Sequence, residues 1–172
     1  MAIAATQFGE SFDSLPSVAG PADKRQDCIL LIEDSEDAML LVQYALGEYG
    51  NGRYRLVWAG SLSEGIERLS KGGVDIVLLD LGLPDHSGEA SYAWLREANS
   101  KIPVVVVTGD SSPETELSVL ASGAEDYLVK TEISGSLLLQ AIQAALSANK
   151  RPRDWYTSPQ QFPRFRKKPS AH

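Results

Sequence analysis

The sequence predicts an α/β protein with a doubly wound, five-stranded parallel sheet and helices on both of its faces. Short apolar runs rich in Val, Ile and Leu, such as residues 29–32 and 104–107, lack polar alternation, which is typical of strands covered on both faces. Segments of helical period separate these runs. A chain that alternates in this way builds an open parallel sheet, in which ligands bind at the carboxyl ends of the strands.

Five strand and helix pairs account for the body of the chain. We expect, in order, strand 28–33, helix 36–48, strand 54–59, helix 62–71, strand 74–79, helix 88–98, strand 103–108, helix 113–122, strand 125–129 and helix 135–148. The strand assignments follow the apolar runs, and the helix assignments follow the segments of period 3.6 between them.

The predicted helix starts have local support. Ser35 is a capping residue ahead of the first helix, where two acids, Glu36 and Asp37, follow it. The second helix begins with Ser61-Leu62-Ser63-Glu64, which has the spacing of a capping box. Ser112 precedes a proline at the first position of the fourth helix, and proline is favoured there because its missing N–H is not needed.

Length and charge indicate one domain with dissimilar ends. A chain of 172 residues with 43% apolar content suits a single core. We expect a flexible lead over 1–26, one domain over 27–149 and a basic tail with Pro and aromatic residues over 150–172. Residues 149–172 hold seven of the sixteen Lys and Arg and one acid, a net charge of +6, so the rest carries −13.

The composition argues against several classes of protein. An acidic body makes nucleic-acid binding by the domain unfavourable, because a phosphate-reading face needs clustered positive charge. Neither a signal peptide nor an apolar run of the roughly 20 residues that cross a bilayer occurs, so we expect no membrane partner. Cys28 is the sole cysteine, begins an apolar run and suits a small core residue in a reducing compartment. We expect a cytoplasmic location.

Polar residues follow the apolar runs of four of the five predicted strands. Glu33 and Asp34 come after the first run, Asp80 after the third, Thr108 after the fourth and Lys130 after the fifth. The carboxyl ends of parallel strands meet at one edge of the sheet, so we expect these side chains to share one crevice. Asp80 is then a candidate nucleophile or metal ligand. The alternative is a solvated carboxylate at a strand end, which the coincidence of the other positions disfavours.

These positions carry a family resemblance over about 120 residues. The chain from Cys28 to Ser147 resembles the response-regulator receiver domain of two-component signalling. The resemblance depends on Glu33-Asp34, on Asp80-Leu81-Gly82-Leu83-Pro84 with Gly88, on Thr108-Gly109, and on Gly123-Ala124-Glu125-Asp126-Tyr127-Leu128-Val129-Lys130. It implies a flavodoxin-like sheet with strand order 2-1-3-4-5.

The resemblance also implies a function and a metal. Asp80 would accept a phosphoryl group from a sensor histidine kinase or a histidine phosphotransfer protein, with Mg²⁺ as cofactor. The metal ligands would be Asp34, Asp80 and the backbone carbonyl of Gly82, with Glu33 holding a bound water. Hard oxygen ligands suit magnesium, and phosphoryl transfer needs mainly a placed nucleophile and positive charge. The protein would not be an enzyme beyond its own phosphorylation and dephosphorylation.

The same resemblance assigns a switch. Lys130 would pair with one phosphoryl oxygen and Thr108 would donate its hydroxyl to another. When Thr108 is drawn to the phosphoryl group, Tyr127 would turn inward and change the face made by the fourth helix, fifth strand and fifth helix. That face would contact a downstream protein or form a homodimer.

Some features depart from the family pattern. Thr131 follows the lysine where proline after a cis bond is common, so the Lys130-Thr131 loop is expected to sit differently. Gly82 offers no side chain to guide a water. The remaining tail is too short and too rich in proline for a DNA-binding module, so we expect signalling by direct protein contact or through the tail.

Two other functions compete with this interpretation. One is an interaction scaffold that keeps the fold and works without phosphorylation. The other is a small magnesium phosphohydrolase, which we rank last because such enzymes want a second acid where Gly82 stands. We expect no functional role for several other polar and aromatic residues. Asp85, Asp110 and Asp126 are expected to be solvated, His86 to be exposed without a catalytic role, and Trp58 and Trp94 to cover the sheet or a helix face.

Overall fold

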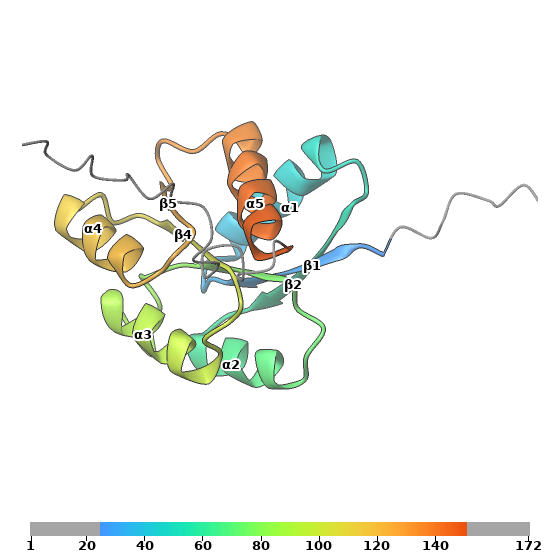
Figure 1. Cartoon of the computed structure of the whole chain (residues 1–172). Coiled ribbons are helices and arrows are strands. Elements are labelled where there is room, and N and C mark those ends of the chain that lie inside the picture. The colour runs from blue at the N-terminus through green and yellow to red at the C-terminus, as the bar shows by residue number, and fades with distance from the viewer. Residues whose placement is uncertain (1–24, 151–172) are drawn as a thin grey trace, which may run out of the picture.

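The computed structural model describes residues 25–150 and forms a single parallel sheet with helices on both faces (Figure 1). The strands are β1 (Asp27–Ile32), β2 (Tyr54–Ala59), β3 (Ile76–Leu79), β4 (Val104–Thr108) and β5 (Asp126–Val129). The helices are α1 (Glu36–Tyr49), α2 (Leu62–Ser70), α3 (Glu89–Ala98), α4 (Pro113–Ala121) and α5 (Gly135–Lys150). The strand order β2-β1-β3-β4-β5 confirms the predicted fold class.

The register aligns the strand ends. Ile32, the last residue of β1, pairs with Ala59 of β2 and with Leu79 of β3. Asp80, the residue after β3, lies beside the end of β1, because its N–H donates to the carbonyl of Ile32 at 3.0 Å. The residues after β1 and β3 therefore lie side by side, which places the acids of both strand ends at one edge of the sheet.

The sheet separates two hydrophobic clusters. One fills the space under α1 and α5, and the other lies under α2, α3 and α4 (Figure 1). Alternate residues of each central strand enter opposite clusters, as Ile29 and Leu30 do, and both are fully buried. Burial of one such side chain contributes about 1.5–3 kcal/mol. The unbroken apolar runs in the sequence thus reflect strands that have no solvent face.

The predicted caps are present. The hydroxyl oxygens of Ser35, Ser61 and Ser112 each accept a hydrogen bond from the backbone N–H three residues later. The Glu64 carboxylate accepts from the N–H of Gly60 at 2.8 Å, so it reaches one residue further back than a standard capping box requires.

Half of the predicted element limits match the structure, and the others differ by one or two residues. The third strand begins at Ile76 rather than 74, because the Asp75 side chain accepts from the N–H of Cys28 and replaces a ladder contact there. The last helix continues to Lys150, which the sequence assigned to the tail. The predicted lead over 1–26 and tail over 150–172 fall almost wholly outside the described residues.

Two other expectations are tested by the fold. Cys28 is buried, as a small core residue would be. Within residues 25–150, none of the helices has the length and apolar character that crossing a bilayer requires.

Candidate functional site

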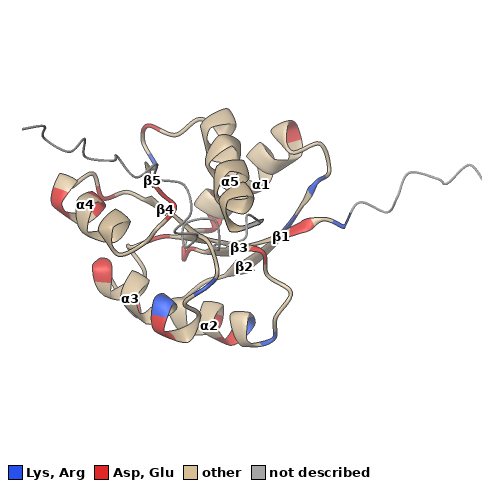
Figure 2. Cartoon of the chain, viewed as in Figure 1, with Lys and Arg blue, Asp and Glu red and all other residues tan. Residues whose placement is uncertain are grey.

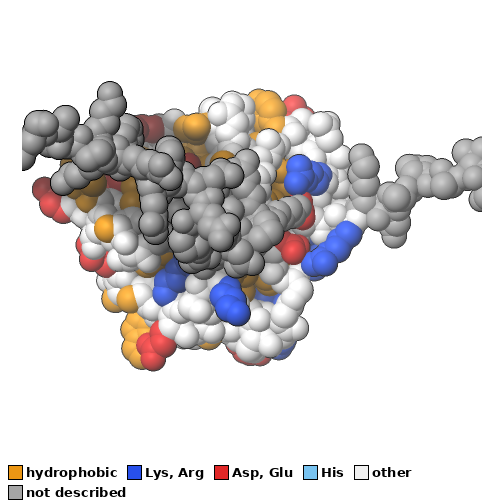
Figure 3. Space-filling model, viewed as in Figure 1, with side chains coloured by type: hydrophobic (Ala, Val, Ile, Leu, Met, Phe, Trp, Pro, Cys, Tyr) orange, Lys and Arg blue, Asp and Glu red, His pale blue; other side chains and the backbone are white. Residues whose placement is uncertain are grey.

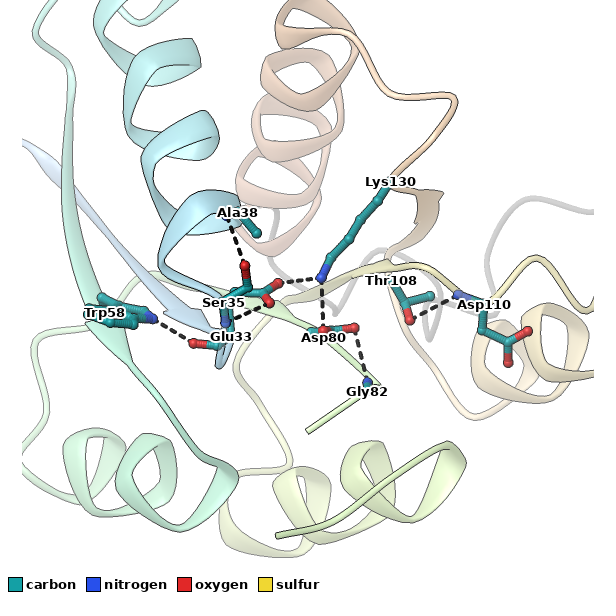
Figure 4. Close-up of polar contacts among 9 residues, drawn as sticks. All are labelled: Glu33, Ser35, Ala38, Trp58, Asp80, Gly82, Thr108, Asp110 and Lys130. Carbon is teal, nitrogen blue, oxygen red and sulfur yellow. Dashed lines mark hydrogen bonds and ion pairs between the residues drawn. The ribbon is translucent and has the colours of Figure 1, made fainter. Parts of the chain in front are cut away.

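The predicted site residues come together at the carboxyl edge of the sheet. Glu33 and Asp34 follow β1, Asp80 follows β3, Thr108 ends β4 and Lys130 follows β5. Figure 4 shows the side chains of Glu33, Asp80 and Lys130 converging on one point between the strand ends. Residues from four distant parts of the chain meet there because parallel strands present their carboxyl ends on the same side.

Three carboxylates form the only cluster of potential metal ligands found within the described part of the chain. Glu33, Asp34 and Asp80 each offer an oxygen, and these oxygens lie within 4.8 Å of one another. Glu33 and Asp80 are 2% and 5% exposed, whereas Asp34 faces solvent. Burial makes the repulsion between the two inner carboxylates strong, so this cluster needs a cation.

Lys130 supplies one positive charge. Its Nζ lies 2.8 Å from Oδ2 of Asp80 and 2.6 Å from Oε2 of Glu33. Burial alone would lower the pKa of Lys130, but the hydrogen bonds and charges of Asp80 and Glu33 outweigh it and raise that pKa above its ordinary value. No cis peptide bond occurs among the described residues, so the lysine reaches both acids with a trans bond before Thr131.

Glu33 is held by several contacts. Its Oε1 accepts from the N–H of Ser35 at 3.1 Å, and its backbone carbonyl accepts from the indole Nε1 of Trp58 at 2.6 Å (Figure 4). Burial raises the pKa of Glu33, and the charge of Asp80 adds to this, against the opposing effect of Lys130. The Trp58 contact could not be predicted from local sequence patterns, since 25 positions separate the two residues.

Asp80 opens into a shallow cleft of about 360 Å³. The cleft is lined by Asp80, Leu81, Gly82, Gly88, Thr108, Gly109, Asp110 and Lys130. The N–H of Gly82 donates to Oδ1 of Asp80 at 3.0 Å. A Cβ at position 82 would lie 3.4 Å from Oδ2, so glycine leaves the approach to the carboxylate open.

Thr108 and Tyr127 are linked through the backbone of Asp110. The hydroxyl of Thr108 accepts from the N–H of Asp110 at 3.3 Å, and the hydroxyl of Tyr127 donates to the carbonyl of Asp110 at 2.9 Å. Tyr127 is 6% exposed and packs in the cluster under α2, α3 and α4. Its side chain therefore already lies inward, the position that the resemblance reserves for the phosphorylated state.

Burial raises the pKa of Tyr127 to about 12, with further contributions from the charges of Asp110, Glu116 and Asp80. The hydroxyl is thus protonated at any physiological pH and remains a donor to Asp110.

Two residues near the site have contacts that were not predicted. Asp85 is exposed, as expected, but its carboxylate also accepts from the N–H groups of Leu62 and Ser63 and from the Ser63 hydroxyl, all within 3.1 Å. Although burial opposes it, these hydrogen bonds hold the pKa of Asp85 far below its usual range. His86 is only partly exposed, and its ring meets that of Trp94 edge-on at 5.6 Å.

Of the other acids expected to be solvated, Asp110 is exposed and accepts from the N–H of Ser112, whereas Asp126 is half-buried. Trp58 lies on β2 and Trp94 on α3, and both are partly exposed. No sequence signal marks the Asp85 contact, because 22 positions separate Asp85 from Ser63.

Known proteins resemble this chain over the same segment. The family profile described as "Response regulator receiver domain" matches residues 29–143. The chain is 34% identical over 134 residues to a probable cyclic di-GMP phosphodiesterase of Vibrio cholerae, covering 77% of this chain and 29% of that protein. It is 37% identical over 103 residues to the swarming motility regulation protein RssB of Serratia marcescens, covering 59% and 45%. The chain thus spans less than half of either relative.

Solved structures agree. The signal receiver domain of a putative LuxO repressor protein from Vibrio parahaemolyticus superposes with a TM-score of 0.65 at 25% identity, covering 73% of this chain and 93% of that one. A two-component response regulator from Clostridium difficile gives 0.64 at 25% identity, covering 73% and 100%. With its five-stranded fold and acidic strand ends, this chain belongs to the response regulator receiver domain family.

Proposed function

We propose that this protein is a phosphoacceptor response regulator in which Asp80 receives a phosphoryl group from a histidine kinase or a histidine phosphotransfer protein. One observation carries the proposal: the Asp80 carboxylate lies at the floor of an open cleft, between a cluster of acids and the ammonium group of Lys130. A nucleophile placed between a cation site and a fixed positive charge is what phosphoryl transfer requires.

The acidic cluster fits a magnesium ion. Its donors are hard carboxylate oxygens, two of the three carboxylates are buried, and Lys130 is the one cation that contacts them among the described residues. Asp34 and Asp80 would hold the ion, together with the backbone carbonyl of Gly82, and Glu33 would hold a bound water. Bound there, magnesium would supply positive charge opposite the oxygens of the incoming phosphoryl group.

Asp80, Lys130 and Thr108 would each have a role in the transfer of the phosphoryl group. An oxygen of Asp80 forms a bond to phosphorus while the bond from phosphorus to the donor imidazole nitrogen breaks, and the imidazole keeps the electron pair. Lys130, which pairs with Asp80 beforehand, then pairs with a phosphoryl oxygen. Thr108 donates its hydroxyl to another. Asp80 therefore becomes a phosphoaspartate, without turnover of a separate substrate.

The switch follows from the Thr108, Asp110 and Tyr127 contacts. A Thr108 hydroxyl that turns to the phosphoryl group gives up the N–H of Asp110, while Tyr127 still holds the carbonyl of the same residue. The loop before α4 is then free to shift, and this alters the α4, β5 and α5 face offered to a downstream protein or a second copy. A change from mostly one state to mostly the other requires about 5.5 kcal/mol of differential interaction.

Phosphorylation of Asp80 is directly testable. Incubation with acetyl phosphate and magnesium should give one base-labile phosphoryl adduct by intact mass spectrometry on the wild type and on Asp110→Asn, and none on Asp80→Asn. Asp110 is the matched control because its exposed carboxylate lines the same cleft. Absence of the adduct on the wild type, or its presence on Asp80→Asn, would contradict the proposal.

The competing scaffold function makes a different prediction. A scaffold that works without phosphorylation would show no thermal shift on addition of magnesium and beryllofluoride, a mimic of the phosphoryl group. A phosphoacceptor should be stabilised by the two together, and Asp80→Ala should abolish that stabilisation.

A further inference from the structure

A groove between α1 and α5 has no assigned role in phosphoryl transfer. It has a volume of about 270 Å³, and its lining is mainly apolar. Its floor includes Val42, Ala45 and Leu138, and at one end Gly135 packs against the ring of Tyr49, where an added Cβ would come within 2.7 Å. The close contact between Gly135 and Tyr49 therefore holds the two helices together beside the groove.

Large apolar side chains stand exposed beside this groove. Leu41 is 71% exposed, Tyr44 67% and Tyr49 53% on α1, and Leu137 is 40% exposed on α5. In Figure 3, hydrophobic side chains reach the surface at the upper edge of the view, where α5 and α1 lie in Figure 1. A contiguous apolar surface of this kind marks a site that another segment covers.

The charges around the groove are of one sign. Asp37, Leu41, Tyr44 and Glu48 are spaced by four, three and four residues, so they form one stripe along α1 with an acid at each end. Neither residues 33–50 nor residues 131–149 contain Lys or Arg, so α5 carries no charge before its last residue, Lys150, and its ribbon is tan over most of its length in Figure 2. Lys130 lines the groove but pairs with Glu33 and Asp80.

This charge pattern selects the occupant. A second copy of the same face would set acids against acids in a two-fold contact, which is unfavourable. A suitable partner is basic and carries aromatic groups. The chain itself contains such a segment directly after α5: residues 151–172 hold six Lys and Arg against one acid, together with Trp155, Tyr156, Phe162 and Phe165.

Residues 151–172 can reach the groove. From Gly135 to Lys150, α5 has 16 residues and is about 24 Å long. The segment begins where that helix ends, and 22 residues span up to roughly 70 Å when extended. A segment tethered so near its site has an effective concentration in the millimolar range, so even a weak contact is populated.

We propose that residues 151–172 dock within the same chain onto the groove between α1 and α5, with aromatic side chains over the apolar stripe and basic side chains against Asp37 and Glu48. Glu33 and Lys130 line both this groove and the acidic site. The docked segment therefore borders the phosphoryl site and competes with any protein that approaches along α1.

Trp155 reports directly on this docking. The chain has three tryptophans, so Trp58→Phe with Trp94→Phe leaves Trp155 as the sole indole in the full-length protein. Docking should give a blue-shifted emission and protection from acrylamide quenching. In that background, Leu41→Ser should shift the emission to longer wavelength and increase quenching. Leu117→Ser on α4 should not, although Leu117 is 69% exposed and thus matches Leu41.

A second pair of variants tests the charges. Glu48→Lys and Glu97→Lys each replace the penultimate residue of a helix, α1 and α3 respectively, at an exposed position. Only Glu48→Lys should release Trp155. Circular dichroism should show the same helix content for all four surface variants.

The outcomes decide between occupants without any phosphorylation step. Trp155 protection that is independent of protein concentration and is lost in Leu41→Ser and Glu48→Lys supports the proposal. A fully quenchable Trp155 in the parent background overturns it. Protection that grows with concentration, alongside dimer mass in sedimentation velocity, also overturns it and assigns the groove to a second copy.

Discussion

Nζ of Lys130 lies 2.8 Å from Oδ2 of Asp80, although 50 positions separate the two residues in the chain. The same ammonium group contacts Glu33 at 2.6 Å. One lysine therefore offsets the charge of two buried carboxylates, and it does so at the position where a magnesium ion is proposed to bind. The stability of the metal-free protein and its affinity for metal should consequently respond to Lys130 in opposite directions.

Lys130→Met should destabilise the metal-free protein by about 1–3 kcal/mol, because two buried carboxylates lose a charged hydrogen-bond partner. Magnesium should then stabilise the variant more than the wild type, because the competing ammonium is gone. Thermal denaturation with and without magnesium measures both effects. Lys71→Met is the control: its pair with Glu67 is exposed and screened by solvent, so this substitution should leave the unfolding temperature nearly unchanged. Equal stabilisation by magnesium in Lys130→Met and in the wild type would show that the Lys130 ammonium does not compete with the metal.

Asp85→Ala should reduce the free energy of unfolding by about 0.5–2 kcal/mol, because the N-terminus of α2 loses an acceptor for two backbone N–H groups. Asp85→Asn, which keeps one acceptor oxygen, should lose less. Denaturant unfolding at neutral pH measures the difference.

The pH dependence of that difference has a definite sign. The pKa of Asp85 is depressed in the folded protein, so its contribution is present above the ordinary value of 3.8 and declines as the pH falls below it. The gap between wild type and Asp85→Ala should therefore narrow in acid. A gap that stays constant down to the acid limit of folding would mean that the carboxylate acts only through its shape.

The sequence was sufficient for the fold and for the meeting of the site residues, because both follow from local patterns. The apolar runs mark buried strands, and Glu33, Asp80 and Lys130 each stand directly after one, so the parallel topology alone brings them together. Contacts that depend on loop paths were not accessible. Asp85 reaches α2 and Trp58 reaches Glu33 through the packing of separate units, and no spacing in the chain encodes either contact.

The inward position of Tyr127 was also beyond the sequence. The side chain of an aromatic residue in β5 can turn inward or outward. For Tyr127, packing in the cluster under α2, α3 and α4 and the hydrogen bond to the Asp110 carbonyl select the inward rotamer. The predicted roles of residues in the lead and tail depend on segments outside the described residues.

Trp58→Phe should weaken magnesium binding. The indole N–H of Trp58 donates to the carbonyl of Glu33 at 2.6 Å, and the N–H of Glu33 donates to the carbonyl of Ala59. Two residues of β2 therefore hold the backbone of Glu33 in place. Loss of one hydrogen bond of about 0.5–1.5 kcal/mol corresponds to a decrease in affinity of roughly two- to tenfold. Calorimetric titration with magnesium measures it, and Trp94→Phe, which is remote from the loop, should bind as the wild type does. Equal affinities for the two variants would show that the indole does not position the acids.

Tyr127→Phe should leave the aromatic packing intact and remove only the hydrogen bond to the carbonyl of Asp110, at a cost of about 0.5–1.5 kcal/mol. The hydroxyl has a pKa of about 12 in the folded protein, above its ordinary value of 10.0. A raised pKa means that the hydroxyl stabilises the fold fully below pH 10 and that this stabilisation is lost as the pH rises towards 12.

The stability difference between wild type and Tyr127→Phe should therefore be constant between pH 7 and pH 10 and shrink above it, as denaturant unfolding across this range would measure. Tyr44→Phe is the control, because Tyr44 is 67% exposed and should give no difference at either end. Because Tyr127 and Thr108 share the backbone of Asp110, the variant should also loosen the loop before α4. Faster amide exchange of Asp110 and Ser111 in Tyr127→Phe would show this coupling, and unchanged exchange would separate the tyrosine from the threonine.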